Sequence, residues 1–292
     1  MQKTENRSIA FAVLAAAFYA LNAPLSKLLL HEIPPTMMAG FLYLGAGCGT
    51  ALLRAVPNTG FQRNEQRLTR KELPYTLAMV LLDIAAPIAL MFGILHSSAA
   101  SVSLLNNFEI VATSLIALLL FREHISKLLW LGIGLVTVSG ILLSLQDGAL
   151  RFSAGSVAVL IACICWGFEN NCTRMLSSKN PLEIVTIKGI FSGLGALLTA
   201  ILLQERLPSA GSILLALLLG FVSYGLSIVF YIYAQRDLGA AKTSAYYAVA
   251  PFLGVALSLL LFREIPSARF LIALLIMIAG TYAVTRADSS AV

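Results

Sequence analysis

Apolar residues gather along the chain into ten long runs, separated by short polar or proline-containing stretches. Each run has about 20 residues, which is the length that an α-helix needs to cross the hydrocarbon core of a bilayer. Prolines mark many of the junctions, as at Pro34-Pro35, Asn180-Pro181 and Pro266. The pattern predicts membrane-spanning helices over residues 8–30, 35–54, 73–96, 99–121, 126–145, 154–177, 182–204, 210–235, 240–262 and 268–286.

Composition and charge support a polytopic membrane protein. The 292-residue chain is 59% hydrophobic and only 12% charged, whereas a soluble domain has about 25% charged residues. With the N-terminus in the cytoplasm, thirteen lysines and arginines face the cytoplasm and four face the other side, as the preference of cytoplasmic loops for positive charge requires. We therefore expect an integral protein of the bacterial cytoplasmic (inner) membrane with both termini in the cytoplasm. The net charge of +6 then reflects topology, and no nucleic-acid partner is expected.

The chain contains an internal repeat. The string LLLFRE occurs at 118–123 and again at 259–264, 141 residues later. Each half of the chain, 8–145 and 154–286, then contains five predicted spans. Because five is odd, the second half must cross the membrane in the opposite sense, which is the inverted-topology repeat common in secondary transporters. A cleaved signal peptide would be the alternative interpretation of the basic start, but the first span has a counterpart in the second half, which favours a retained helix.

The repeated segments resemble a known family. SLLNNFEIVATSLIALLLFREHIS and APFLGVALSLLLFREIPS look like the paired EamA repeats of the drug/metabolite transporter superfamily, and CWGFENNCTRML resembles the start of its second repeat. The chain departs from the family pattern at Tyr19-Ala20, where Trp-Gly is usual, and at Ile110, where the second repeat keeps Pro251. The resemblance implies an all-α transporter of ten helices with a central cavity, and a single chain as the transport unit.

Three acidic residues lie deep inside predicted spans. Asp83 and Glu109 fall near the middle of their spans, and Glu169 lies roughly 6 Å from the centre of its span. An acid at the centre of a membrane helix costs on the order of 2.5–3.5 kcal/mol and usually marks a pathway, a relay or a counter-ion. We expect Glu109 and Asp83 to couple transport to a proton or ion; a buried ion pair or a helix-packing hydrogen bond is the structural alternative. Three basic residues nearer the span ends are expected mainly to extend toward the headgroups: Lys27, Arg174 and Lys188.

Aromatic and polar residues share one predicted helix face beside Glu169. Trp166, Glu169 and Asn170 follow the i, i+3, i+4 spacing that places side chains on one side of a helix. An aromatic ring beside a carboxylate suits a ligand with an ammonium group. The first span repeats the arrangement with Tyr19 and Asn22, and later spans add two tyrosines. The residues expected to bind substrate are therefore Trp166, Glu169, Asn170, Tyr19, Asn22, Tyr224 and Tyr247.

Other kinds of machinery are not indicated. The sequence has no G-x-x-x-x-G-K-[ST] loop, so an internal ATP motor is excluded. Its four cysteines fall within predicted helices and its three histidines at span ends, so we expect no disulfide framework, no metal and no cofactor. A membrane enzyme would need a nucleophile–base pair or a metal cluster, and a channel would need a ring or filter loop; neither pattern is present.

These features predict a secondary transporter that works by alternating access. Its partners would be the lipid bilayer and a small polar substrate, with an amino acid or a related amine-bearing compound as the leading candidate, export as the leading direction and a proton as the candidate coupling ion. Uptake of a choline-like quaternary amine is the alternative.

Overall fold

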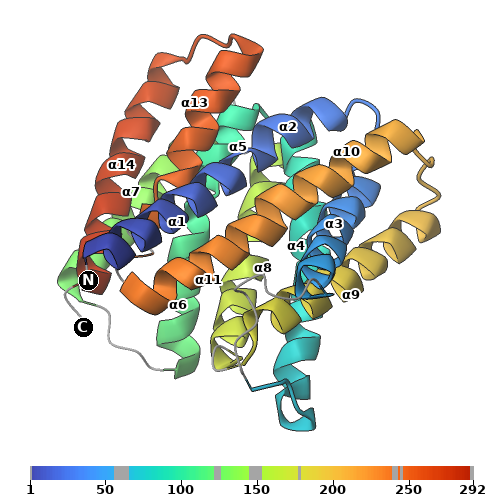
Figure 1. Ribbon diagram of the computed structural model, residues 1–292. Coiled ribbons are helices and arrows are strands. Elements are labelled where there is room, and N and C mark those ends of the chain that lie inside the picture. The colour runs from blue at the N-terminus through green and yellow to red at the C-terminus, as the bar shows by residue number, and fades with distance from the viewer. Residues whose placement is uncertain are drawn as a thin grey trace.

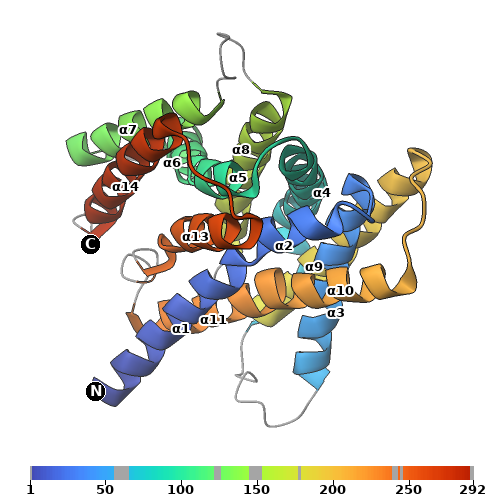
Figure 2. The ribbon, with the colours of Figure 1, turned by 90° about the horizontal axis from the view of Figure 1, so that it is seen from above.

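The computed structural model describes residues 2–55, 66–121, 126–144, 153–176, 179–238, 243 and 246–289. Within these ranges the chain is helical, and helices from both halves form one bundle (Figures 1 and 2). The helices of the first half are α1 (Gln2–Ala20), α2 (Asn22–Leu29), α3 (Pro35–Ala55), η1 (Arg70–Glu72), α4 (Leu73–His96), α5 (Ala99–Leu105), α6 (Phe108–Phe121) and α7 (Lys127–Ser144). Those of the second half are α8 (Ala154–Met175), α9 (Pro181–Leu202), α10 (Ala210–Gly220), η2 (Phe221–Leu226), α11 (Ser227–Leu238), α13 (Ala250–Phe262) and α14 (Ala268–Ser289).

The helices confirm the predicted all-α, ten-helix membrane architecture. Nine helical stretches in the described residues are long and apolar enough to cross a bilayer, and Ala250–Phe262 forms a shorter tenth apolar helix. The bounds agree with the hydropathy pattern to within a few residues: the span predicted at 182–204, for example, is the helix Pro181–Leu202. The predicted span 240–262 begins among residues that lie partly outside the described ranges.

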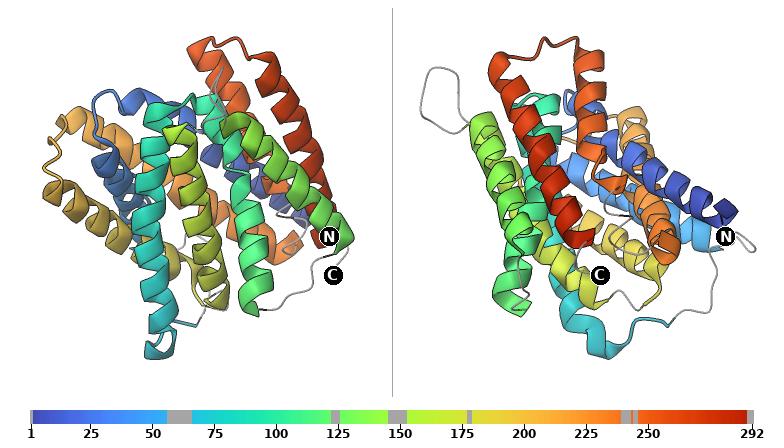
Figure 3. Two further views of the ribbon diagram at one scale, coloured as in Figure 1. Left: turned by 180° about the vertical axis from the view of Figure 1, so that it is seen from behind. Right: turned by 90° about the vertical axis from the view of Figure 1, so that its left-hand side faces the viewer.

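The main helix contacts are symmetric between the two halves of the chain. When each helix is replaced by the equivalent helix of the other half, the contact is found again. The second spans of the halves, α3 and α9, pack against each other, and so do the fifth spans, α7 and α14. The contact of α4 with α8 has its counterpart in the contact of α11 with α1, and that of α6 with α8 in that of α13 with α1. Figure 3 shows α7 alongside α14 at one edge of the bundle. The interior of the molecule is therefore an interface between the halves.

Glycines allow α3 and α9 to approach closely. A Cβ added to Gly189 would lie 2.3 Å from the backbone nitrogen of Gly47, and one added to Gly47 would lie 2.5 Å from the nitrogen of Ile190. Such distances leave no room for a side chain at either position. Small residues at this kind of crossing are typical of helix packing in membranes.

Several spans are interrupted inside the bundle. The first span turns at Leu21 and the fourth at Asn106-Asn107, and the eighth contains the π-helical segment η2. Such interruptions are tolerated at membrane depth where they are buried in protein or line a cavity. In transporters they lie near binding sites between the repeats.

The N-termini of α3 and α9 are each tied to the other half of the chain. Glu205, which follows α9, accepts hydrogen bonds from the backbone N–H groups of Thr36 at 3.2 Å and Met37 at 2.8 Å. Lys179, which precedes α9, forms an ion pair with Glu72 at 3.3 Å. Because the halves are inverted, the two ties lie toward opposite faces of the membrane.

Candidate functional site

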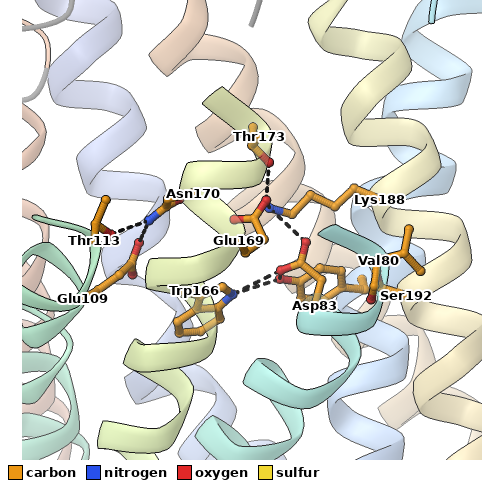
Figure 4. A network of polar contacts seen from close by, with 11 residues as sticks. Val80, Asp83, Glu109, Thr113, Trp166, Glu169, Asn170, Thr173, Lys188 and Ser192 are labelled. Atoms are coloured by element: carbon orange, nitrogen blue, oxygen red, sulfur yellow. Dashed lines mark hydrogen bonds and ion pairs between the residues drawn. The ribbon is translucent and has the colours of Figure 1, made fainter. Parts of the chain in front are cut away.

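A buried lysine joins two buried acids between the halves. The Nζ atom of Lys188 on α9 lies 3.0 Å from Oδ2 of Asp83 on α4 and 3.0 Å from Oε1 of Glu169 on α8 (Figure 4). Asp83 is 0% exposed and Glu169 is 2% exposed. We call Asp83, Glu169 and Lys188 the ion-pair cluster. It is the kind of buried charge group that persists only when its members are paired.

The expectation that Lys188 extends to the headgroups is wrong. Its side chain is only 12% exposed and points inward to Asp83 and Glu169. Lys188 lies seven residues into α9, which is deep enough to reach two carboxylates on neighbouring helices. Their attraction in a site of low dielectric constant outweighs access to water.

Lys27 does lie at the end of the bundle. Its Nζ atom donates to the backbone carbonyls of Ile94 at 2.6 Å, Leu95 at 3.0 Å and Ser97 at 2.8 Å, at the C-terminal end of α4. A cation there binds carbonyl groups that lack a helical partner. The side chain of Arg174 lies outside the described residues.

The other oxygen of Asp83 accepts two aromatic donors. The hydroxyl group of Tyr43 on α3 donates to Oδ1 at 2.8 Å, and the indole N–H of Trp166 on α8 donates to the same oxygen at 3.2 Å. The indole also lies 3.4 Å from the Tyr43 hydroxyl oxygen. Asp83 therefore contacts two aromatic donors through Oδ1 and the Lys188 ammonium group through Oδ2.

Asn170 and Glu109 form a separate pair on the other side of α8. The Asn170 side-chain amide donates to Oε1 of Glu109 at 2.7 Å and to Oγ1 of Thr113 at 3.2 Å, both on α6. Trp166 and Glu169 instead face α4 and α9. Thr173, one turn further along α8, also donates to Glu169 (Figure 4). The face predicted on this helix is thus divided between α6 on one side and α4 and α9 on the other. An ion pair and a hydrogen bond from a side-chain amide are the two structural arrangements that the sequence analysis gave as alternatives for these acids.

The remaining predicted site residues meet around Tyr224. The Asn22 amide donates to the Tyr224 hydroxyl at 2.9 Å. The Tyr19 ring lies 6.1 Å from that of Tyr224 and 5.9 Å from that of Tyr247. We call Tyr19, Tyr43, Tyr224 and Tyr247 the tyrosine cluster, because the ring centroids of Tyr43 and Tyr224 are 5.2 Å apart. Tyr43 therefore contacts both this cluster and Asp83.

Acidic side chains outnumber basic ones in this part of the interior. Three acidic side chains, of Asp83, Glu109 and Glu169, and one lysine, Lys188, belong to the network that Figure 4 draws; Lys188 pairs with Asp83 and Glu169, and Glu109 binds Asn170. Such a group of charges attracts a cationic ligand or a proton. In the part of the chain that the structure describes, no set of three histidine, cysteine, aspartate or glutamate side chains is placed to hold a metal ion.

Three residues of the site were missed in the sequence. Tyr43 and Thr113 lie well inside predicted spans, but nothing in their local pattern separates them from residues that only pack. Lys188 gave a stronger signal, because a lysine seven residues into an apolar helix needs either a path to water or a charged partner. Asp83 and Glu169, acids on two other spans, are those charged partners.

Comparisons with known proteins agree with this architecture. The sequence model of the EamA-like transporter family matches the chain twice, at residues 6–145 and 153–286. An uncharacterized transporter from Methanothermobacter thermautotrophicus is 25% identical, with 92% of this chain and 83% of that protein aligned. A crystal structure of another protein matches with a TM-score of 0.66 at 16% identity and covers 94% of both chains, which supports the fold alone. The chain therefore belongs to the EamA-like transporter family and is a membrane transporter.

Proposed function

We propose that the protein moves a small zwitterionic metabolite, an amino acid or a closely related amine-bearing compound, by alternating access between its two halves. The observation that carries this proposal is the bridge of Lys188 between Asp83 and Glu169. The cluster offers a cation and an anion side by side. An amino acid carries the complementary pair of charges on one small molecule.

Substrate binding would exchange partners within the cluster. The ammonium group of the substrate would pair with the Glu169 carboxylate, and its carboxylate would pair with Lys188. Each buried charge would keep a partner of opposite sign throughout, so no unpaired charge is created at membrane depth. Asp83 would hold Lys188 in place through Tyr43 and Trp166, which both donate to its other oxygen.

Glu109 is the proposed proton carrier. Its described partner is the neutral amide of Asn170, so protonation of Glu109 breaks no ion pair. An amide group can serve either state, because its NH₂ group donates to a carboxylate and its oxygen accepts from a carboxylic acid. Protonation of Asp83 or Glu169 would instead weaken a contact with Lys188.

A choline-like quaternary amine is the second candidate substrate, and the tyrosine cluster is the feature that favours it. Rings at these separations can surround a cation through their faces. Lys188 opposes that candidate, because its charge repels a permanent cation and a quaternary amine has no carboxylate to pair with it.

We further propose that the protein lies in the bacterial inner membrane with both termini in the cytoplasm, and that export is its physiological direction.

Reconstituted transport tests the proposal. Purified protein in liposomes would be supplied with radiolabelled amino acids, choline and sugars, with and without a pH gradient. We expect an amino acid to be transported and Glu169→Gln to abolish the flux. The exposed Glu264 supplies the control Glu264→Gln, which should transport normally. Transport of choline alone would overturn the zwitterion proposal, and normal flux in Glu169→Gln would remove Glu169 from the site.

A further inference from the structure

A small cavity lies where interrupted membrane spans meet. Its walls come from the α1–α2 junction, the end of α5 and the start of α13, and these elements contact one another. Figure 2 shows α13 between the α1–α2 junction and α5 in this view. The cavity is small, about 10 Å³, which is enough for a single water molecule or a bare ion.

Two polar side chains in the wall are buried without partners. The Oγ atom of Ser103 and the Oδ1 atom of Asn106 have no hydrogen-bond partner, although the residues are only 4% and 7% exposed. Buried polar atoms are almost always paired. The neighbouring Asn107 shows the usual situation, because its amide donates to Leu104 at 3.2 Å and its oxygen accepts from Thr281 at 3.4 Å. The two orphaned oxygens indicate a site that a ligand completes.

A backbone oxygen faces the same cavity. In a continuous helix the Ala20 carbonyl would accept from the N–H group of residue 24, but Pro24 has no N–H group to donate. Gly254 lies opposite: a Cβ added there would be 2.9 Å from Ser103 Oγ and 3.4 Å from the Ala20 oxygen. The lack of a side chain at Gly254 leaves this space open.

The chemistry of these oxygens selects the ligand. A carboxamide, a hydroxyl and a backbone carbonyl are ligands that hard cations prefer. No carboxylate lines the cavity, so neutral oxygens must stabilise the whole charge, which favours a monovalent ion over a divalent one. The volume excludes an organic cation. We propose that this cavity binds a sodium ion, held by Ser103, Asn106 and the Ala20 carbonyl; carbonyls at helix interruptions coordinate sodium in other transporters.

The site would hold three spans together beside the tyrosine cluster. Asn22 lines the cavity and also donates to Tyr224, so a bound ion would lie next to the tyrosine cluster. The sodium proposal does not depend on which substrate the ion-pair cluster binds. It adds a binding site in which none of the acids or Lys188 takes part.

Thermal unfolding of the purified full-length protein in detergent tests the site directly. The apparent Tm would be measured in NaCl and in KCl at equal ionic strength, over a range of concentrations. A ligand that binds only the folded state raises the Tm in a saturable way, so we expect a rise with NaCl that KCl does not produce. Loss of one oxygen ligand in Ser103→Ala should weaken the apparent sodium affinity about tenfold, and Gly254→Ala should abolish the response because its methyl group fills the cavity.

A matched serine on another helix supplies the control. Ser144 is also buried, but its hydroxyl group donates to the Gly140 carbonyl of its own helix at 2.7 Å. Ser144→Ala should therefore keep the full sodium response. Each variant is compared with itself in the two salts, so a general loss of stability does not obscure the result.

Two outcomes would overturn the sodium site. Equal Tm values of the wild type in NaCl and KCl would leave water as the occupant. A sodium response retained in both Ser103→Ala and Gly254→Ala would place the ion elsewhere. Neither outcome affects the proposed transport of an amino acid, which the liposome flux measures separately; conversely, a sodium response without amino-acid flux would support this site and contradict the proposed function.

Discussion

Lys188 and Asp83 come from opposite halves of the chain, yet their charged atoms lie 3.0 Å apart in the interior of the bundle. The pair joins α9 to α4, and Glu169 on α8 joins the same lysine. A buried charge of this kind becomes a large cost when its partner is removed. Substitutions in the ion pair are therefore expected to affect stability first.

Lys188→Gln should destabilise the protein strongly. It leaves Asp83 and Glu169 buried without a cation, and loss of one partner of a buried pair costs about 3–5 kcal/mol. Asp83→Asn/Lys188→Gln should lose less than the sum of the two single variants, because neutralising Asp83 removes one of the unpaired charges. Thermal unfolding of the four proteins would measure this coupling. The exposed Lys71 supplies the control Lys71→Gln, and strict additivity would contradict the coupling.

Tyr43→Phe should lower the transport rate clearly while lowering the Tm only modestly. The substitution keeps the ring that packs beside Tyr224 but removes the hydroxyl group that donates to Asp83 at 2.8 Å. A hydrogen bond to a charged group contributes about 1.5–3 kcal/mol, and Trp166 still donates to the same oxygen. We expect a modest fall in Tm and a severalfold lower flux in liposomes. Tyr75 is 38% exposed, so Tyr75→Phe should change neither; an unaltered flux in Tyr43→Phe would remove Tyr43 from the mechanism.

Glu109→Gln should abolish the response of export to pH. If protons enter as the substrate leaves, an acidic exterior loads the Glu109 carboxylate outside and accelerates efflux. A glutamine stays neutral at every pH and cannot carry the proton. We therefore expect wild-type efflux to rise when the outside is acidified, and efflux from Glu109→Gln to be independent of the gradient.

The conservative variant Glu109→Asp is the matched control for that measurement. It keeps a titratable group on α6, so it should retain part of the pH response. A full response in Glu109→Gln would assign proton coupling to another residue.

Gly189→Ala should destabilise the contact between α3 and α9. The new methyl group would lie 2.3 Å from the Gly47 nitrogen, so the helices must separate, and overpacking of this kind costs about 1–3 kcal/mol. Gly134 is the matched control, because a Cβ there meets nothing within 4 Å. Gly134→Ala should leave the Tm unchanged or raise it, since alanine favours a helix. A Tm of Gly189→Ala equal to that of the wild type would show that the crossing can relax.

Local pattern predicts the spans of this protein better than it predicts the site. Run length and proline positions located the helices because the bilayer sets their length. The i, i+3, i+4 spacing predicts that Trp166, Glu169 and Asn170 share one helix face, but it contains no information on which neighbours that face meets. The structure divides these residues between α6 on one side and α4 and α9 on the other.

The missed residues depend on the rotation and depth of distant helices. Lys188 was interpreted from its distance to the end of its own span, whereas its position is determined by two acids on other spans. Tyr43 contributes through a hydroxyl group whose partner, Asp83, lies 40 residues away. Local sequence indicates that Lys188 needs a charged partner, but it does not identify that partner for either Lys188 or Tyr43.

The two ties at the starts of α3 and α9 differ in chemistry, which makes the two faces of the protein unequal toward dissolved salt. Glu205 binds backbone N–H groups, so half of that tie belongs to the main chain. The tie between Lys179 and Glu72 joins two partly exposed side chains, and mobile ions screen such pairs. Rising ionic strength is therefore expected to loosen one end of the protein before the other, which in the proposed alternating-access cycle would bias the face of the membrane toward which it opens.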